Sequence, residues 1–504
     1  MKHSENRSAA DVALISLSGR LLTLFGRTMS LATFGGANPL LNAFTYALNV
    51  PNILFNVIGT ALTTVMIPVY SSLLAEERRD EAKKFIDNII SIAIVFIGVL
   101  VVLGIMAAPL ITHFFAGEAL EDAAFLTFSL RFLMPVMIFF GFSAIFQGLL
   151  QSNGIFRLPA LVSAPGGVVI ILYLLFLSDR FGVRGLVFAT AFGLFLQPLI
   201  MVPAMAKIGY RYKFSIDLKN PHIITAAKLS LPVLVSVSAY QVNFLFNNTI
   251  ALRYFGTVAI MDFAQQLVQV FMLTLVYAIA AVYFPKLSAL WAKDDRSAYL
   301  ESLRSALQYT IFIVLPAALG FFLLRYEIMD FLLNWREAAE GNYGTDITVA
   351  GNLLGLYSIG IIAISMKETM DRAFYSAKDS KTPAAFGLTI MSVNIVSTLM
   401  LLPFLGLYSM PVAYCISAFC GALGLGFSLN RRTRFINSTL SLNFAKILLA
   451  ALIMLLAAEL GRRLELSRIS LVNLIIPAVF GAAAYFLAAF LLKIPAALLI
   501  FKAR

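Results

Sequence analysis

Apolar runs of about 20 residues follow one another along almost the whole chain, and short polar connectors separate them. As an α-helix, a run of this length crosses the hydrocarbon core of a bilayer, which is about 30 Å thick. The composition agrees, because 60% of the residues are hydrophobic and only 13% are charged, whereas soluble domains have about 45–50% and about 25%. We therefore expect an all-α polytopic membrane protein.

The apolar runs define about fourteen expected membrane-spanning helices. The hydrophilic start, Met1 to Asp11, is followed by no small-residue cleavage site, so we expect the first helix to remain in the mature protein. The approximate limits of the expected helices are 10–36, 38–74, 86–115, 124–151, 158–178, 184–208, 222–254, 257–291, 300–334, 346–376, 382–404, 408–430, 442–461 and 470–500.

Basic residues indicate on which side of the membrane each connector lies. With the N-terminus in the cytoplasm, alternate connectors carry most of the Lys and Arg residues, which predicts that both termini are cytoplasmic. The net charge of +12 then reflects topology and not a nucleic-acid partner. The basic connectors contain Arg78, Arg79, Lys83 and Lys84; Arg157; Lys207, Arg211, Lys213 and Lys219; Lys286, Lys293 and Arg296; Lys378 and Lys381; and Arg431, Arg432 and Arg434.

The chain contains an internal duplication. Segment 67–79 resembles segment 284–296, since each closes an expected span with a proline and runs into a charged connector. Further matches recur at offsets of 217 to 224 residues, as for a repeat of six spans. An even number of spans predicts two lobes in a parallel pseudo-two-fold repeat, with substrate between them. The expected parts are an N-lobe over 1–215, a C-lobe over 216–435 and two C-terminal helices over 436–504.

Two arginines, Arg20 and Arg27, lie seven residues apart inside the first expected span. A charge at the centre of a membrane helix costs about 2.5–3.5 kcal/mol on insertion scales, so such residues usually face a bundle interior or a water-filled cavity. Guanidinium stays ionised and matches phosphate geometry, which predicts an anionic substrate such as a diphosphate headgroup. Small and hydroxyl residues are expected on the same wet face, namely Ser16, Gly19, Thr23 and Ser30.

Polar stripes mark further expected helices. Amide and hydroxyl side chains recur at three- and four-residue steps in the second span, and the seventh and eighth spans repeat the theme. Any single amide is equally well explained by hydrogen bonding between helices. Stripes at equivalent positions of two lobes, together with two arginines, predict a hydrated cavity. The candidate substrate-binding residues are Arg20, Arg27, Asn42, Asn49, Asn52, Asn56, Asn243, Asn247, Asp262, Gln265, Gln266 and Gln269.

The tenth expected span ends in four charged residues, Lys367, Glu368, Asp371 and Arg372. Their spacing is typical of a solvated helix end with i,i+4 ion pairs. Lys367 and Glu368 could also reach the mouth of the expected cavity.

Catalytic and metal-binding patterns are absent from the sequence. His3, His113 and His222 are far apart, and neither a metalloprotease motif nor a Walker-type glycine loop occurs. The cluster 165–167 (Pro-Gly-Gly) indicates close helix packing or a kink, and the two cysteines are expected to be inert small hydrophobes. We therefore expect a transporter without a cofactor, and the sequence leaves open whether a coupling ion or the membrane potential drives it.

Several segments resemble the MurJ (MviN) family of lipid II flippases, in the MOP exporter superfamily. They are Pro51 to Leu54, Ile67 to Ser71, Gln241 to Thr249 and, most specifically, Arg372 to Pro383. The resemblance implies fourteen helices, a cavity lined by helices one, two, seven and eight, and a groove beside helices thirteen and fourteen for a lipid tail.

The resemblance also implies alternating access that moves undecaprenyl-diphosphate-linked peptidoglycan precursor from the inner to the outer leaflet of the bacterial cytoplasmic membrane. Membrane lipids and the cell-wall synthesis machinery are the implied partners. Arg27 matches a family arginine, and Arg20 lies about one residue out of register with a second. Family charges are replaced by uncharged residues at Thr28, Asn42, Phe55, Asn56, Gln265 and Gln266.

Those replacements leave alternatives open. One is a flippase for another undecaprenyl-diphosphate-linked glycan. A cation-coupled multidrug exporter fits less well, because arginines repel cationic drugs and only Asp262 offers a buried acid. A membrane-embedded glycosyltransferase would need acid-rich loops longer than those near 206–221 and 334–346. Besides transporters and enzymes, a membrane scaffold that transports no substrate is a third class of protein.

Overall fold

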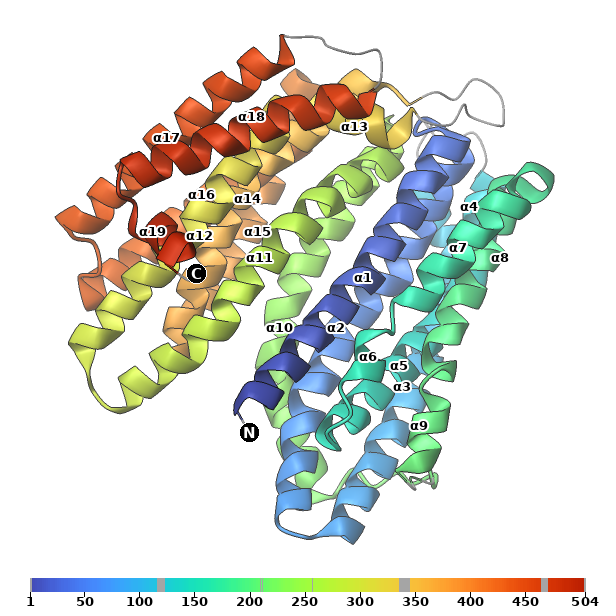
Figure 1. Cartoon of the computed structure of the whole chain (residues 1–504). Helices are drawn as coiled ribbons and strands as arrows, with labels where there is room; N and C mark the ends of the chain where they lie inside the picture. Colours follow the sequence, from blue (N-terminus) through green and yellow to red (C-terminus); the bar gives the residue numbers. More distant parts are fainter. Residues whose placement is uncertain are drawn as a thin grey trace. The chain divides into compact units, whose positions relative to one another are not determined.

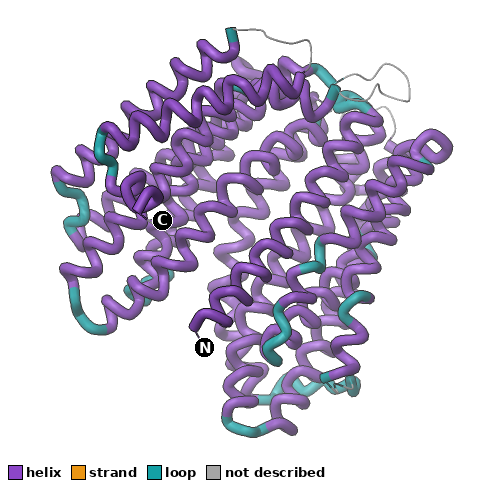
Figure 2. The backbone as a smooth tube through the Cα atoms, in the orientation of Figure 1, coloured by secondary structure: helices purple, strands orange, loops and turns teal. Residues whose placement is uncertain are grey.

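The computed structural model describes residues 2–115, 123–208, 210, 212–255, 257–334, 345–463 and 470–502 (Figure 1). Every regular element in these ranges is a helix (Figure 2). Ten of the described helical segments are long and apolar enough to cross a membrane. The all-α membrane fold is therefore confirmed, and the expected count of fourteen agrees roughly, because each expected span overlaps one to three consecutive helices.

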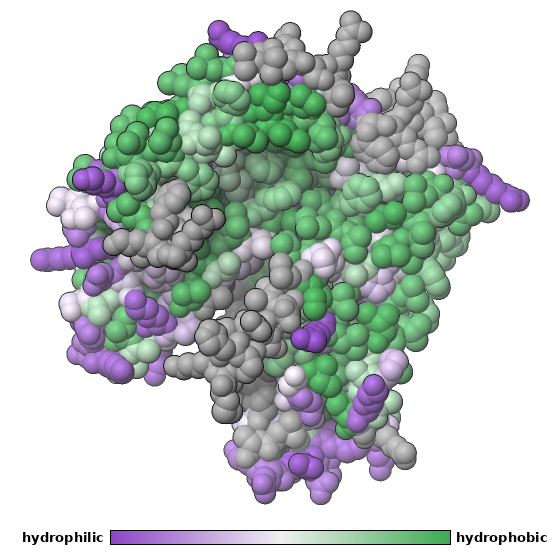
Figure 3. Space-filling model, viewed as in Figure 1, coloured by the Kyte–Doolittle hydropathy of each residue, from purple (hydrophilic) through white to green (hydrophobic). Residues whose placement is uncertain are grey.

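Hydrophobic side chains cover much of the visible surface (Figure 3). Many large apolar side chains are exposed along the helices, including Phe96, Met106 and Phe404. In a soluble protein such a surface would promote aggregation, whereas in a bilayer it contacts lipid tails. This surface supports the assignment as a multi-pass membrane protein.

The chain divides by its internal contacts into two compact units. Unit 1 is Met1–Ile260 with Arg336–Thr345, and unit 2 is Met261–Trp335 with Asp346–Arg504. The lobe limits expected from the duplication, 1–215, 216–435 and 436–504, describe the repeat and stay a prediction.

Unit 1 is built around α2, which packs against α3, α4, α5 and α10, while α1 packs mainly against α7. Its elements are α1 (Lys2–Phe34), α2 (Pro39–Ala75), α3 (Arg79–Phe115), α4 (Ala123–Leu133), α5 (Val136–Ser152), α6 (Arg157–Ala160), α7 (Ala164–Phe176), α8 (Ser178–Leu199), α9 (Val202–Lys207), α10 (Pro221–Ile250) and the π-helical turn η1 (Ala251–Phe255).

The connector from α9 to α10 is fastened to the start of α3. The Asp87 carboxylate accepts hydrogen bonds from the Tyr210 hydroxyl (2.6 Å) and the Lys213 backbone N–H (3.3 Å), and it pairs with Lys83 (2.7 Å). Asn88 exchanges two hydrogen bonds with the backbone of Asp217 (2.7 and 2.9 Å). Burial and the bond to Asp87 hold the pKa of Tyr210 well above its usual range. These bonds place the beginning of α10 beside α3, within unit 1.

Unit 2 has two hydrophobic clusters. One joins α11, α12, α14, α16 and α17, and the other joins α12 to α17, α18 and α19. The elements are α11 (Val258–Ala292, whose first turn belongs to unit 1), α12 (Arg296–Leu323), α13 (Arg325–Leu333), α14 (Ile347–Ser376), α15 (Lys381–Leu405), the 3₁₀ turn η2 (Gly406–Tyr408), α16 (Ser409–Thr433), α17 (Ser438–Arg462), α18 (Ser470–Leu491) and α19 (Pro495–Lys502).

Basic connectors of unit 2 lie together at one end of its helices. Arg432, at the end of α16, lies 2.6 Å from Asp379 in the α14–α15 connector, and the Arg304 Nε of α12 donates to the carbonyl oxygen of Phe435 (2.7 Å). Burial opposes ionisation of Asp379, but hydrogen bonds from Thr382 and Arg432 outweigh it and lower the pKa of Asp379 to about 2. The positive-inside pattern predicts that this end is cytoplasmic.

Candidate functional site

The glycine and hydroxyl face of α1 is covered by α7. The Thr23 hydroxyl donates to the carbonyl oxygens of Gly19 (3.1 Å) and Ser163 (3.3 Å). A Cβ atom on Gly19 would lie 2.5 Å from the Ser163 Oγ, so the two helices approach closely there. The expectation that this face of α1 lines a wet cavity is therefore wrong for Gly19 and Thr23, because they pack against the start of α7.

The glycine pair of α7 permits this approach. A Cβ atom on Gly167 would lie 2.8 Å from the backbone carbon of Leu22 and 2.9 Å from the Thr23 nitrogen. On the other side, a Cβ on Gly193 of α8 would lie 2.9 Å from the Cα of Gly166. The sequence prediction that the cluster 165–167 indicates close helix packing is confirmed.

The two arginines of α1 differ in exposure. Arg20 is exposed and Arg27 is half-buried. Seven residues correspond to about 10.5 Å along an α-helix, so the two guanidinium groups could contact opposite ends of one extended headgroup. Next to Arg27, Thr28 is buried and donates to the Leu24 carbonyl oxygen (3.0 Å). The hydroxyl of Thr28, a position at which the family resemblance implies an acid, is thus bonded within its own helix.

The amide stripe of α2 splits into a buried half and an accessible half. Asn42 is fully buried, and its amide donates to the carbonyl oxygens of Gly36 (3.0 Å) and Asn38 (2.9 Å). Its Oδ1 accepts the Ala259 backbone N–H at the start of α11 (2.8 Å). In this structure Asn42 therefore fastens helix ends within unit 1 and presents no free amide to a solute. Farther along, Asn52 is half-buried and Asn56 is exposed.

Polar residues also hold α2 against α10. Asn49 is buried and its amide donates to the Asn248 Oδ1 (3.3 Å), while the Tyr46 hydroxyl lies 3.1 Å from the Thr249 hydroxyl. Sequence reasoning included Asn49 among the substrate-binding candidates, but here it belongs to a helix contact. The partners Asn248 and Thr249 were missed as structural residues, although they occupy the helical turn after Asn243 and Asn247.

Two candidate amides of α10 interact with each other. Asn243 and Asn247 are half-buried, and the Asn247 amide donates to the Asn243 carbonyl (3.0 Å) and side-chain oxygen (3.2 Å). Four candidate substrate-binding amides of unit 1 thus keep some solvent exposure. They are Asn243 and Asn247 of α10 and Asn52 and Asn56 of α2.

In unit 2, the candidates of α11 centre on one carboxylate. Asp262 is buried, and the Gln266 amide lies 3.2 and 3.3 Å from its two oxygens. Gln265 and Gln269 are half-buried. A carboxylate that is buried and bonded to an amide one turn away is poorly placed to receive a bulky cationic drug.

The charged end of α14 is more buried than the sequence indicated. The expected ion pairs form, since Lys367 Nζ lies 2.5 Å from Asp371 Oδ2 and Arg372 lies 3.9 Å from Glu368. The side chains of Lys367 and Asp371 are only 13% and 5% exposed, so a solvated helix end is the wrong interpretation. The apolar residues on either side of the four charges could have revealed this burial, because they continue the hydrophobic pattern of the helix.

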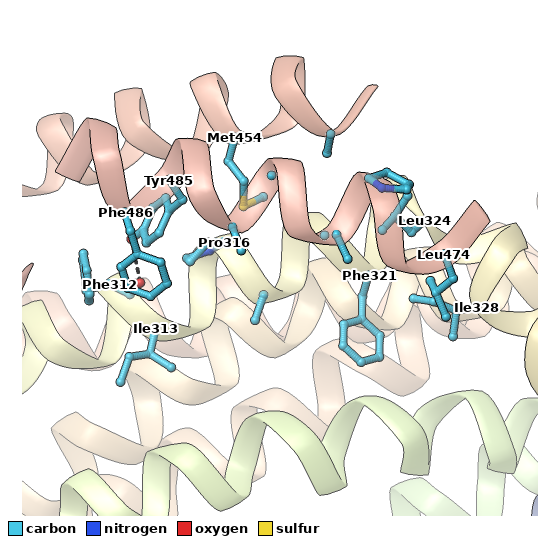
Figure 4. A pocket seen from close by; sticks show the side chains of 17 residues that line it. Phe312, Ile313, Pro316, Phe321, Leu324, Ile328, Met454, Leu474, Tyr485 and Phe486 are labelled. Carbon is cyan, nitrogen blue, oxygen red and sulfur yellow. Dashed lines mark hydrogen bonds between the residues drawn. The ribbon is translucent and has the colours of Figure 1, made fainter. Parts of the chain in front are cut away.

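An apolar cavity of about 520 Å³ lies among α12, α13, α17 and α18 (Figure 4). Its wall contains Phe312, Pro316, Met454, Phe486 and Tyr485, whose hydroxyl donates to the Phe312 carbonyl oxygen (2.6 Å). Since α17 and α18 are the helices expected as thirteen and fourteen, the cavity lies where the family resemblance implies a groove for a lipid tail. Within the described ranges, no group of three His, Cys, Asp or Glu residues could hold a metal ion.

Comparisons with known proteins agree with this architecture. The model of the family described as lipid II flippase MurJ matches residues 31–491. A protein from Bdellovibrio bacteriovorus, named probable lipid II flippase MurJ, is 26% identical over 95% of this chain and 94% of its own length. The structure is similar to a lipid II flippase MurJ in an inward closed conformation (TM-score 0.81, 23% identity, 95% of this chain and 97% of that one). It is also similar to an inward-facing multidrug resistance MATE transporter (TM-score 0.61, 19% identity, 85% and 99%).

Proposed function

Because the chain belongs to the MurJ family of lipid II flippases, we propose that it moves lipid II from the inner to the outer leaflet of the bacterial cytoplasmic membrane by alternating access. The match of the family model over most of the chain carries this proposal. Both termini then lie in the cytoplasm. The protein acts as a transporter that changes no covalent bond, and its cargo is the undecaprenyl-diphosphate-linked precursor.

Arg27 and Arg20 of α1 bind the diphosphate in this proposal. A guanidinium group offers a planar fork of donors that matches phosphate oxygens, and it remains charged at every physiological pH. Arg27 is half-buried, so its charge acts in a medium of lower dielectric constant than that around the exposed Arg20. We therefore expect Arg27 to contribute more to binding.

Amides that keep solvent exposure contact the sugar and peptide in this proposal, namely Asn52, Asn56, Asn243, Asn247, Gln265 and Gln269. Asn42, Asn49 and Asp262 are buried, and Gln266 bonds to Asp262, so these four residues support the helices that carry them.

The apolar cavity among α12, α17 and α18 holds part of the isoprenoid chain. Its volume of about 520 Å³ lies within the range of sites that enclose a small molecule, so most of a 55-carbon tail stays in the bilayer. No cofactor takes part, and an ion gradient or the membrane potential supplies the energy. Membrane lipids and the cell-wall synthesis machinery are the partners.

Reconstituted protein tests the proposal. Fluorescent lipid II in proteoliposomes should become accessible from the opposite leaflet without covalent change. Arg27→Ala should slow this movement about tenfold or more, since it removes charge-assisted hydrogen bonds, and Arg20→Ala should slow it less. Arg431→Gln, which removes an exposed charge at the end of α16, is the control and should have little effect. No movement by the wild type, or full activity of the double arginine variant, would refute the assignment.

A second candidate is a flippase for another undecaprenyl-diphosphate-linked glycan, which the uncharged residues at Asn56, Gln265 and Gln266 favour. Competition distinguishes the two cargoes. Unlabelled lipid II should inhibit labelled lipid II movement more strongly than an undecaprenyl-diphosphate-linked O-antigen unit does. The reverse order would support the second candidate.

A further inference from the structure

The charged end of α14 contains two ion pairs of unequal quality. Lys367 and Asp371 form a tight pair at 2.5 Å, with side chains 13% and 5% exposed. Glu368 and Arg372 lie 3.9 Å apart, and their side chains are 27% and 32% exposed. The first pair is closed and buried, whereas the second is at the limit of direct contact and remains accessible.

Arg372 has unused hydrogen-bonding capacity. Its Nε is buried and finds no hydrogen-bond acceptor among the described residues. The guanidinium carbon lies 6.0 Å from the ring of Phe284 on α11, which places an aromatic face near the charge. Arginine carries five N–H donors, and the Glu368 carboxylate that pairs with Arg372 lies at the distance limit of 3.9 Å. A buried donor without an acceptor is unfavourable, so a better anion would be bound in place of Glu368.

The depth of Arg372 matches that of a lipid headgroup. Arg372 is four residues before Ser376, the end of α14, which is about 6 Å along the helix axis. The 30 residues of α14 span about 45 Å, close to the thickness of a bilayer with its headgroups. Lys378 and Lys381 follow directly, on the side that the positive-inside rule predicts to be cytoplasmic. This topology predicts that the guanidinium lies at the level of phosphates in the inner leaflet.

We propose that Arg372 is a loading site for the diphosphate of a lipid-linked substrate in the cytoplasmic leaflet, and that Glu368 occupies Arg372 until the substrate displaces it. The inference rests on the proposed function for the class of substrate. A diphosphate accepts two parallel hydrogen bonds from a guanidinium group, which a carboxylate 3.9 Å away does not achieve. In the empty state Glu368 keeps the arginine from being an uncompensated charge.

The site belongs to unit 2 and is separate from the arginines of α1 in unit 1. Asp371 lies next to Arg372 in the chain, but its Oδ2 is held by Lys367 at 2.5 Å.

Equilibrium binding of undecaprenyl diphosphate to the full chain in lipid nanodiscs tests the inference. Arg372→Gln should weaken binding about tenfold or more, because one bidentate charged contact is lost. Glu368→Gln should tighten binding by about threefold or more, because it removes the competing carboxylate. Arg372→Lys should bind with intermediate affinity, since an ammonium group cannot form the fork. Arg431→Gln is the matched control and should stay within about twofold of the wild type.

Unchanged affinity in Arg372→Gln, or no tightening in Glu368→Gln, would overturn the inference. Inorganic pyrophosphate is the second probe and should bind far more weakly than the lipid, so equal affinity would contradict a site at headgroup depth. If Arg372→Gln unfolds, as circular dichroism would reveal, the tighter binding of Glu368→Gln and the intermediate affinity of Arg372→Lys decide alone. Binding is measured without transport, so a wild type that binds the lipid but moves no lipid II refutes only the proposed function.

Discussion

Asp379 joins two basic connectors of unit 2, and its replacement tests whether this contact stabilises the fold. Its Oδ1 accepts the backbone N–H groups of Lys381 and Thr382 (3.0 Å each) at the start of α15, and its Oδ2 accepts from Arg432 (2.6 Å) and from the Thr382 hydroxyl (2.7 Å). Asp379→Asn keeps an acceptor for the helix end and loses the charge. Asp379→Ala loses both.

The lowered pKa of Asp379 sets the size of the effect. A fall from 3.8 to about 2 corresponds to about 2.4 kcal/mol at 1.36 kcal/mol per unit. Because the Arg432 side chain is 54% exposed, solvent screening reduces this to about 1–2 kcal/mol. Loss of the helix cap in Asp379→Ala adds about 1 kcal/mol. The contribution is complete above the usual pKa of 3.8, falls to about half at pH 3, and vanishes as the pH drops below about 2.

Thermal unfolding in detergent, followed by circular dichroism, measures these effects. At pH 7, Asp379→Asn should lower the Tm by roughly 2–4 °C per kcal/mol, the value for a domain of the size of unit 2, and Asp379→Ala should lower it further. The difference between wild type and Asp379→Asn should be constant from pH 8 to pH 5 and shrink at pH 3. Arg431→Gln is the control and should leave the Tm unchanged. An equal Tm for wild type and Asp379→Asn at pH 7, or a difference that grows on acidification, would refute the reasoning.

Three further predictions test structural roles against binding roles. Gly167→Ala should lower the Tm, because its Cβ would lie 2.8 Å from the α1 backbone. Gly98→Ala, with no neighbour within 4 Å, is the control and should leave the Tm unchanged or raise it. Equal effects of the two substitutions would contradict the close packing of α1 and α7. Asn42→Ala should destabilise the protein by about 1–3 kcal/mol, since it leaves the Ala259 N–H buried without an acceptor. Asn56→Ala, at an exposed position, should alter substrate affinity instead. A stable Asn42→Ala variant with weakened binding would show that Asn42 contacts the substrate. Asp87→Ala should expose the α9–α10 connector to limited proteolysis about tenfold faster, because charge-assisted bonds hold it, and an unchanged cleavage rate would show that these bonds are dispensable.

The sequence predicted the helices well because the membrane constrains them strongly. In the hydrocarbon core of the bilayer, the backbone N–H and C=O groups of a single spanning segment must bond to one another. A long apolar run therefore forms an α-helix. Spacing also predicted the partners inside one helix correctly, as for Lys367 with Asp371 and Glu368 with Arg372. Such i,i+4 contacts depend only on helix geometry and not on neighbouring elements.

Periodicity did not reveal which neighbour covers a given face. Thr23 and Asn42 carry the same signal as a cavity-lining residue, yet Thr23 bonds to α7 and Asn42 to the start of α11. In a membrane helix an amide that joins two helices and an amide that contacts a substrate have the same composition and spacing. Only the positions of the surrounding helices distinguish them.

The sequence by itself thus determined the helical membrane fold and the family, because each follows from composition, period or motif along one dimension, whereas the duplication stays a prediction. The tertiary structure decided which polar groups are already bonded within the protein and which remain accessible. In the tertiary structure Lys367 and Asp371 are buried, and the carboxylate that pairs with Arg372, that of Glu368, is distant. The physical reason is that burial and hydrogen-bond saturation depend on contacts between residues far apart in the chain, which no local pattern encodes.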